Sequence, residues 1–532
     1  MRPTALGLAA AFLLAACAAV EAPPAAVSAT DSDEAVTARV FDAIRDRPPL
    51  LQAYLRRMPK GADLHSHLSG VVYAETYLAW AAETGLCFDR RAATLVAPSP
   101  PCDADMGRPP VAGASTAERN RMIDALSMRN FVAGECAASG HTQFFATFGR
   151  FGPAGDGRLG EMLAEAATRA ADNGVLHLEL MVTLGDGAER RAADAAAGTG
   201  AWDGDFARLE AALAPSMPAA LAAVRRQLDA GEARMRAVLG CGGAAPPPGC
   251  AVSIRYLAQI LRLAPARRVF AQTQLAVAAV RADPRVVGLN YVGPEDDPVA
   301  LRDYRLHMRI LRHFRERDGG VPIALHAGEL APGLVPPEDL RFHIREAVEV
   351  AGARRIGHGI DVMHEDDPIG LLRVMAAKGV LVEINLTSND VILGIRGANH
   401  PFPVYRAFGV PTALSTDDEG VSRSEMTAEY LRAVADFGLG YGELKRLARD
   451  SLAHSFLPGD GLWTTVDPPV PAPACAGVAP GASPPAECAA LLGSSEKARM
   501  QRRLEAAFVA FEAMVRADAG RHPFLLRREP AR

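Results

Sequence analysis

Residues 322–326 read PIALH, residues 340–351 read LRFHIREAVEVA, and residues 355–358 read RIGH. The first and last are short apolar runs typical of buried strands, and the middle stretch has the apolar spacing of an amphipathic helix. The next two segments repeat this pattern, with helical spacing at 367–378 and an apolar run at 380–385. This order predicts parallel strands joined by right-handed crossovers.

The same alternation extends through the rest of the chain. Five further runs rich in apolar and β-branched residues lie at 62–65, 175–182, 251–256, 286–292 and 411–416. Most of them are separated by stretches with helical spacing, so the chain is expected to be an α/β protein. Eight such runs predict a closed (β/α)8 barrel of the TIM type.

Three segments do not fit the repeat within the expected barrel domain, residues 33–532. Residues 86–140 and 186–250 are longer than ordinary crossovers, so they are expected to be insertions after the first and second strands. Residues 459–496 are dense in Pro, Ala and Gly and predict an irregular excursion before a last helix at 495–517.

The composition excludes several classes of protein. Of 532 residues, 49% are hydrophobic and 22% charged, which excludes a disordered or fibrous chain. The formal net charge is -5, and no cluster of Lys and Arg stands out. Nucleic acid is therefore not an expected partner, because binding it requires basic residues that neutralise phosphates. The sequence predicts no particular oligomeric state.

The N-terminal residues predict export from the cytoplasm. Arg2 precedes an apolar run at 5–16 that is too short to cross a bilayer of about 30 Å, so residues 1–16 are expected to be a signal peptide. Residues 14–17 read LAAC and resemble the bacterial lipoprotein cleavage box, which makes Cys17 the expected lipid anchor. A flexible tether would follow at 17–32. We expect a location in the bacterial cell envelope, anchored to the outer membrane and facing the periplasm, or secretion; the alternative is ordinary secretion after cleavage near Ala22.

Six cysteines fall in close pairs that suit an oxidising compartment. Local pairing is the simplest of the fifteen connectivities open to six cysteines. The spacings are unlike the C-x2-C clusters of zinc fingers, which are the competing interpretation. Cys136 is left over and is expected to be a buried free thiol. The expected disulfides are Cys87 with Cys102, Cys241 with Cys250, and Cys475 with Cys488.

Polar side chains gather where the predicted strands end. His65 and His67 point to the same side of an extended chain, so both can bind one ion. In a barrel the carboxyl ends of all strands converge around one mouth, where distant residues meet. Several His and one carboxylate suit a catalytic zinc better than magnesium; iron(II) and cobalt are the alternatives. The other clusters are His326 with Glu329, then His358, then Asp417 with Asp418.

These clusters resemble the adenosine deaminase family. The similarity covers roughly residues 55–456 and includes MPKG at 58–61, LHSHL at 64–68, HAGE at 326–329, IGHG at 356–359 and TSN at 387–389, followed by TDD at 416–418. Asn399, His400 and Pro401, with the insertions and the leader, are more similar to the secreted adenosine deaminase-related growth factor branch.

The resemblance implies a function and a role for each of nine residues. The expected reaction is the hydrolytic deamination of adenosine or 2'-deoxyadenosine to the inosine product and ammonia, with one Zn2+ per chain. His65, His67, His326 and Asp417 would hold the zinc. Glu329 would donate a proton to N1 of the purine, and His358 would orient the attacking water and accept its proton. Asp418 would hydrogen-bond N7, the backbone of Gly293 would meet N3, and Ser69 would lie at the sugar.

Three departures leave the substrate open. Ser69 stands where many family members have a ribose-binding Asp, Asn385 and Leu386 replace a Cys-Pro pair, and Glu419 replaces a Pro. Adenine, a modified aminopurine nucleoside and an aminodeoxyfutalosine-like compound are the alternative substrates. A nucleoside-binding surface lipoprotein without catalysis is the alternative function. A binuclear amidohydrolase is disfavoured, because no Lys lies at the fourth strand. Glu295 and Asp361 are expected to support the site from behind.

Overall fold

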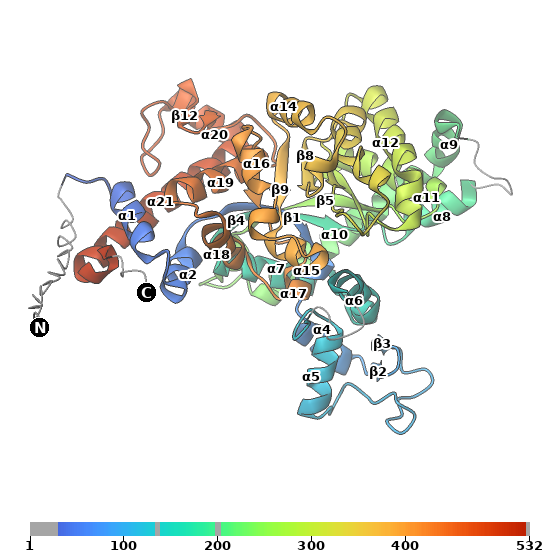
Figure 1. Cartoon of the computed structure of the whole chain (residues 1–532). Coiled ribbons are helices and arrows are strands. Elements are labelled where there is room, and N and C mark those ends of the chain that lie inside the picture. The colour runs from blue at the N-terminus through green and yellow to red at the C-terminus, as the bar shows by residue number, and fades with distance from the viewer. Residues whose placement is uncertain (1–29, 133–138, 197–203, 528–532) are drawn as a thin grey trace, which may run out of the picture.

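The structure is a computed structural model that describes residues 30–132, 139–196 and 204–527 (Figure 1). The expected signal peptide, Cys17, most of the tether and Cys136 lie outside the described residues. Eight parallel strands form the centre of the fold, and each overlaps one of the runs expected from the sequence. They are β1 (Gly61–His67), β4 (Val175–Val182), β5 (Ser253–Leu261), β6 (Val286–Val292), β7 (Ala324–Ala327), β8 (Arg355–His358), β9 (Leu381–Ile384) and β10 (Thr412–Leu414).

The eight strands form a curled parallel sheet in chain order. Two four-stranded sheets have the orders β1-β4-β5-β6 and β7-β8-β9-β10. A parallel bridge between Leu289 and Ile323 joins them on one side, and a bridge between Ser66 and Asp417 joins them on the other. This connectivity is consistent with the predicted (β/α)8 barrel, and we refer to the eight strands as the barrel.

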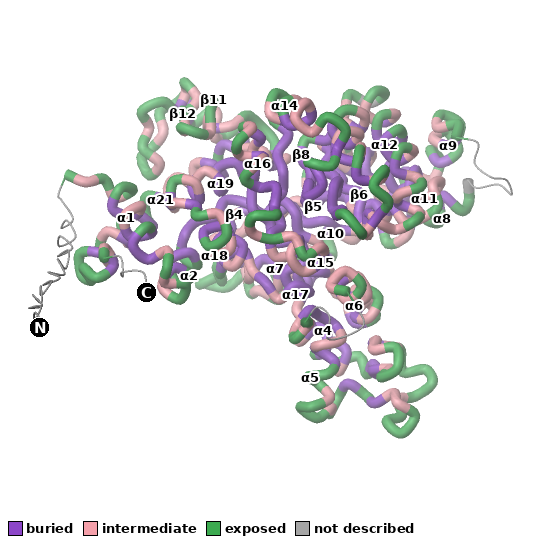
Figure 2. The backbone as a smooth tube through the Cα atoms, viewed as in Figure 1, coloured by how far each residue is buried: buried purple, intermediate pink, exposed green. Residues whose placement is uncertain are grey.

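The barrel strands are buried, because helices cover their outer faces. Every residue of β6 is buried, as expected for a parallel strand with both faces covered. In Figure 2 the buried backbone is concentrated in the barrel. The main helices that follow its strands are α7 (Leu159–Asp172), α10 (Met217–Leu239), α11 (Ala266–Ala282), α12 (Pro298–Asp318), α13 (His343–Glu346), α14 (Pro368–Lys378), α15 (Leu386–Leu393), α16 (Phe402–Ala407), α17 (Glu419–Ser422), α18 (Met426–Phe437) and α19 (Tyr441–Ala453).

The segment after β1 projects away from the barrel in Figure 1. It holds a small hairpin, a disulfide between Cys87 and Cys102, and a helix with a capping box formed by Ser115 and Glu118. The polypeptide then returns to the barrel through a long helix. The elements are α3 (Leu68–Val71), α4 (Ala74–Glu83), β2 (Cys87–Asp89), β3 (Thr94–Val96), α5 (Thr116–Ala125) and α6 (Gly140–Gly155).

The other expected disulfides are also present, so the predicted pairing is confirmed. Cys241 and Cys250 close the turn that follows α10. Two shorter helices, α8 (Ala188–Ala196) and α9 (Phe206–Leu213), come before α10 in the chain. Cys475 and Cys488 link the segment that holds β11 (Trp463–Val466), β12 (Pro469–Pro471) and α20 (Ala486–Ser494).

The two ends of the described chain pack together. The last long helix, α21 (Glu496–Arg521), lies against α1 (Asp33–Ile44) and α19, and α2 (Pro48–Arg57) leads from α1 into β1. Among the described residues, no helix combines the length and the apolar character needed to cross a bilayer.

Candidate functional site

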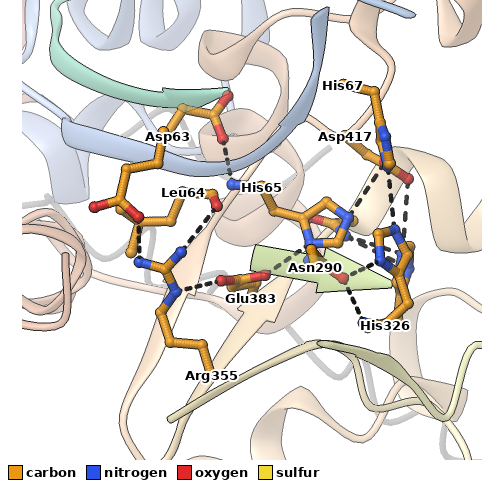
Figure 3. A network of polar contacts seen from close by, with 12 residues as sticks. Asp63, Leu64, His65, His67, Asn290, His326, Arg355, Glu383 and Asp417 are labelled. Carbon is orange, nitrogen blue, oxygen red and sulfur yellow. Dashed lines mark hydrogen bonds and ion pairs between the residues drawn. The ribbon is translucent and has the colours of Figure 1, made fainter. Parts of the chain in front are cut away.

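The structure brings the four predicted metal ligands together at the carboxyl ends of the strands. His65 and His67 come from the end of β1, His326 from β7, and Asp417 from the residues after β10 (Figure 3). The Nε2 atoms of His67 and His326 are 3.1 Å apart. Oδ1 of Asp417 lies 3.4 Å from Nε2 of both His65 and His67. Residues far apart in the sequence therefore converge on one point.

Each of these three histidines has an oxygen partner at its outer ring nitrogen. Because those oxygens accept hydrogen bonds, Nδ1 carries the hydrogen and Nε2 presents a lone pair to the centre of the cluster. This arrangement is typical of histidines that bind metals, since the outer partner fixes the orientation of the ring. The Nδ1 atoms and their partners are His65 with Glu383 at 2.7 Å, His67 with Gln259 at 3.1 Å, and His326 with Asn290 at 2.9 Å.

The donor set fits a metal cation. Two Nε2 lone pairs that face each other at 3.1 Å repel one another unless a cation or a proton lies between them. Within the described residues, Nε2 of His65 and Oδ1 of Asp417 have no hydrogen-bond partner although both are buried. Burial lowers the pKa of His65, but Asp417 and Glu383 raise it to about 10, so the site attracts positive charge. His358 also belongs to this group of possible ligands.

Glu329 lies beside the cluster and is held in its neutral form. The side chain is only 6% exposed, and its Oε1 is 3.7 Å from Nε2 of His358. Burial, and next the negative charge of Asp417, raise the pKa of Glu329 well above its ordinary value. Burial lowers the pKa of His358 to about 3. The pair therefore presents a protonated carboxyl group and an uncharged imidazole to the same point.

The backbone at two of these positions is in the left-handed region. His358 has a φ of 69° and Asp417 has a φ of 58°. Non-glycine residues seldom adopt this conformation, which costs about 1–3 kcal/mol and concentrates at functional sites. The fold thus maintains a strained backbone at two strand ends in order to aim these side chains inward.

Glu295 holds the backbone at Glu329 in place, so it is a supporting residue, as the sequence suggested. Its two carboxylate oxygens accept hydrogen bonds from the backbone N–H groups of Gly328 at 3.2 Å and Glu329 at 2.9 Å. Nδ1 of His343 donates to the same carboxylate at 2.6 Å, and the ring of Tyr304 stacks on His343. His343 is a supporting residue that the sequence did not predict, because nothing in its local pattern points to this contact.

Asp361, the other expected supporting residue, lies behind the same loop. It is buried, and a Cβ atom added at Gly328 would collide with its carboxylate. Burial raises the pKa of Asp361 well above its ordinary value. No hydrogen-bond partner for either carboxylate oxygen is found among the described residues.

The TSN stretch at 387–389 supplies two supporting residues that had no assigned role. Oγ of Ser388 donates to Oδ2 of Asp417 at 2.7 Å, which orients the carboxylate. Nδ2 of Asn389 lies 2.9 Å from Nδ1 of His358. Both residues lie in the first turn of α15, the short helix that follows β9.

A buried arginine connects the cluster to the interior of the barrel. Nε of Arg355 is 2.7 Å from Oε1 of Glu383, the residue whose other oxygen accepts from His65 (Figure 3). Nη1 of Arg355 is also 2.7 Å from Glu179. The arginine therefore balances two buried carboxylates that would be costly without a partner.

A cavity of about 420 Å3 opens in front of the cluster. It contacts Glu329, His67, His326 and Asp417 on one side. Many of the other lining residues are apolar or aromatic, which suits a flat ring system. All three predicted substrate-binding residues line it, and the walls include Ser69, Gly293, Asp418, Phe144, Phe145, Phe148, Leu261 and Leu263.

The departures from the family pattern lie close to the site. Asn385 is buried, with Nδ2 at 3.5 and 3.4 Å from the two ring nitrogens of His358. Leu386 opens α15 and is buried. Burial raises the pKa of Glu419 to about 8, so this carboxyl is neutral at pH 7. None of the three occupies a position among the candidate metal ligands.

Together the fold and site define an α/β protein with a candidate metal centre at the strand ends of a parallel barrel. Residues 211–467 match the family model described as adenosine deaminase. The adenosine deaminase of Serratia proteamaculans is 37% identical over 149 residues, which cover 28% of this chain and 42% of that protein. That of Enterococcus faecalis is 33% identical over 141 residues, which cover 26% and 38%. The chain spans less than half the length of these curated relatives.

The chain was also compared with solved structures. The apo N6-methyl-AMP deaminase from Arabidopsis thaliana has a TM-score of 0.48 and 19% identity, covering 76% of this chain and 94% of that one. The family model over residues 211–467 and the curated relatives support the adenosine deaminase family for this chain. The growth factor branch stays a prediction.

Proposed function

We propose that this chain is a zinc-dependent aminohydrolase that converts adenosine or 2'-deoxyadenosine to inosine or 2'-deoxyinosine and ammonia. The observation that carries the proposal is the neutral carboxyl group of Glu329 beside His358 at the edge of the His and Asp cluster. An acid next to a cluster of metal ligands is what hydrolytic removal of a ring amino group requires.

The metal would be held by His65, His67, His326 and Asp417. When bound, zinc lowers the pKa of a coordinated water from about 16 to about 7, which supplies a nucleophile near neutral pH. The donor set, three imidazoles and one carboxylate, favours zinc, with one ion per chain.

Four residues of the protein have separate roles in the remaining steps. Glu329 donates a proton to N1 of the purine, which makes C6 electrophilic, and His358 orients the water that attacks C6. The C6–N bond then breaks and the oxygen of the water stays on the ring. One proton of the water leaves with the amino group as ammonia, and the other returns to Glu329, while the proton that Glu329 donated stays on N1. Burial and the charge of Asp417 raise the pKa of Asp418 well above its ordinary value, so that it can donate to N7. The Gly293 N–H would donate to N3.

The cavity supports a purine and leaves the rest of the substrate open. The aromatic wall formed by Phe144, Phe145 and Phe148 suits a flat base. A second cavity of about 620 Å3 adjoins the first one, and Ser69 and Gln259 line both. Space on that side would accommodate a sugar or a larger substituent. Adenine and modified aminopurine nucleosides are the alternative substrates, and a non-catalytic nucleoside-binding lipoprotein is the alternative function.

Ammonia release from a panel of aminopurines tests this proposal. We expect the zinc-loaded protein to release ammonia from adenosine and 2'-deoxyadenosine, and to lose the activity after treatment with a chelator and recover it when zinc is returned. Release of ammonia from adenine alone would show that the substrate is the free base and not a nucleoside. Tight binding of adenosine with no ammonia from any compound would establish the non-catalytic alternative.

We also propose a location in the cell envelope, with a lipid anchor on Cys17. The three disulfides support it, because such bonds persist in oxidising compartments. A Cys17→Ala variant expressed with labelled fatty acid is expected to lose the label and to leave the membrane fraction. Equal labelling of both proteins would overturn the proposed anchor.

A further inference from the structure

A line of hydrogen bonds connects a backbone amide to the outer ring nitrogen of His358. The N–H of Phe402 donates to Nδ1 of His400 at 3.1 Å. Nε2 of His400 is 3.1 Å from Oδ1 of Asn389, and Nδ2 of Asn389 is 2.9 Å from Nδ1 of His358. His400 is 3% exposed, and Asn389 and His358 are fully buried, so water does not compete for these contacts.

The backbone amide sets the direction of every bond in this line. An N–H group can only donate, so Nδ1 of His400 must accept, and a neutral His400 carries its hydrogen on Nε2. Burial lowers the pKa of His400 to about 4, which agrees with a neutral ring. Nε2 then donates to the amide oxygen of Asn389, and the NH2 group of Asn389 donates to His358.

The reverse orientation of Asn389 is disfavoured by the same contacts. If its amide were turned around, its NH2 group would face the N–H of His400, and two buried donors would be left without acceptors. An unpaired buried donor costs about 1–3 kcal/mol. Asn385 does not oppose this assignment, because its Nδ2 is almost equally far from both ring nitrogens of His358.

We propose that Asn389 and His400 are positioning residues that fix the tautomer of His358, with its hydrogen on Nε2. That nitrogen faces Oε1 of Glu329 at 3.7 Å and Oδ2 of Asp417 at 3.8 Å. His358 thus enters the reaction as a hydrogen-bond donor. It stabilises the oxygen of the attacking water and does not take its proton through Nε2. This differs from the acceptor role that the family resemblance implies, and it rests on the proposed function.

A neutron crystal structure of the deuterated, zinc-loaded protein reads the tautomer directly. We expect deuterium on Nε2 of His358 and on Nε2 of His400, and none on Nδ1 of either ring. Deuterium on Nδ1 of His358 would overturn the inference. This readout does not depend on turnover, so a protein without deaminase activity would defeat the proposed function while the tautomer could still be read.

Substitutions separate positioning from simple packing. His400→Leu removes the donor to Asn389, and we expect kcat to fall about 10–100-fold with KM and zinc content little changed, as for other supporting partners of site histidines. His400→Gln retains an N–H group at this position and is expected to recover part of that loss. Asn389→Asp offers acceptors to both rings and should move the hydrogen of His358 to Nδ1. Equal kcat in His400→Leu and His400→Gln, or an unmoved hydrogen in Asn389→Asp, would contradict the assignment.

Discussion

Glu329 is the residue on which the proposed chemistry depends most. Its carboxyl group is protonated in the folded protein because burial and the charge of Asp417 both disfavour the ionised form. Glu329→Gln retains the size of the side chain but cannot transfer a proton, so kcat is expected to fall about 10²–10⁴-fold, the usual contribution of a general acid. Zinc content should not change. Steady-state kinetics and elemental analysis check both statements.

Glu338→Gln provides the matched control for this prediction. Glu338 is exposed and lies nine positions further along the chain, in a short 3-10 helix after β7. The same change of charge at this position is expected to leave kcat within about twofold, as for most surface substitutions. A Glu329→Gln protein as active as Glu338→Gln would show that Glu329 is not the acid.

The sequence predicted the inner residues of the site and two supporting residues, Glu295 and Asp361, but not the hydrogen-bond partners of the metal ligands. His65, His67, His326 and Asp417 were predicted because each follows an apolar run, and a barrel brings such positions together. Glu383 could not be found in this way. It lies within a buried strand, and its carboxylate meets His65 across 318 positions of sequence only when the barrel closes.

The strands themselves carry a packing requirement at Gly357 in β8. A Cβ atom at this position would lie 2.7 Å from Nδ1 of His65, which is closer than van der Waals contact allows. Gly357→Ala is therefore expected to displace the His65 ring and weaken zinc binding about 10–100-fold, as measured by competition with a chromogenic chelator.

Gly442→Ala is the control for this steric prediction. Gly442 lies in α19, and a Cβ atom there would have no neighbour within 4 Å. Alanine is favoured over glycine in helices, so this variant should bind zinc normally and gain a little stability. If Gly357→Ala binds zinc as tightly as Gly442→Ala, the contact between β8 and His65 does not position the ligand.

Asp450 in α19 gives the fold a predictable dependence on pH. Burial raises its pKa to about 7, well above the value of an unfolded chain. The folded state therefore prefers the protonated form of Asp450. The contribution of this residue to the free energy of unfolding is fully present below about pH 4 and is lost as the pH rises through 7. Asp450→Asn cannot ionise and should show a smaller loss of unfolding free energy between pH 5 and 8.

The expected difference between Asp450→Asn and the unchanged protein is a few kcal/mol, since each pKa unit corresponds to about 1.4 kcal/mol. Urea denaturation at several pH values measures it. Parallel pH curves for the two proteins would mean that Asp450 ionises in the folded state as it does in the unfolded one.

At the level of elements, the barrel strands were predictable and the projecting segment was not. Parallel strands covered on both faces, such as β6 and β9, appear in the sequence as largely apolar runs. The segment after β1 has few such runs. The capping box of Ser115 and Glu118 was a readable helix signal within it, but the direction in which it projects depends on contacts that local patterns do not encode.

At the scale of the whole molecule, metal binding and folding should be linked. The ligands come from β1, β7 and the end of β10, so an ion that binds only the folded chain stabilises the entire barrel. At a free zinc concentration about 100 times Kd, the expected gain is about 2.7 kcal/mol. Calorimetry should show a lower Tm for the chelator-treated protein and a full recovery with zinc. Equal Tm values would contradict this link.

The central claim is that one zinc ion lies among His65, His67, His326 and Asp417. Anomalous diffraction from crystals of the protein, recorded on both sides of the zinc absorption edge, tests it most directly. The account predicts a single strong peak in each chain, within about 2.0–2.2 Å of the three Nε2 atoms and one oxygen of Asp417. A map with no peak at this position, from crystals grown with zinc present, would contradict it.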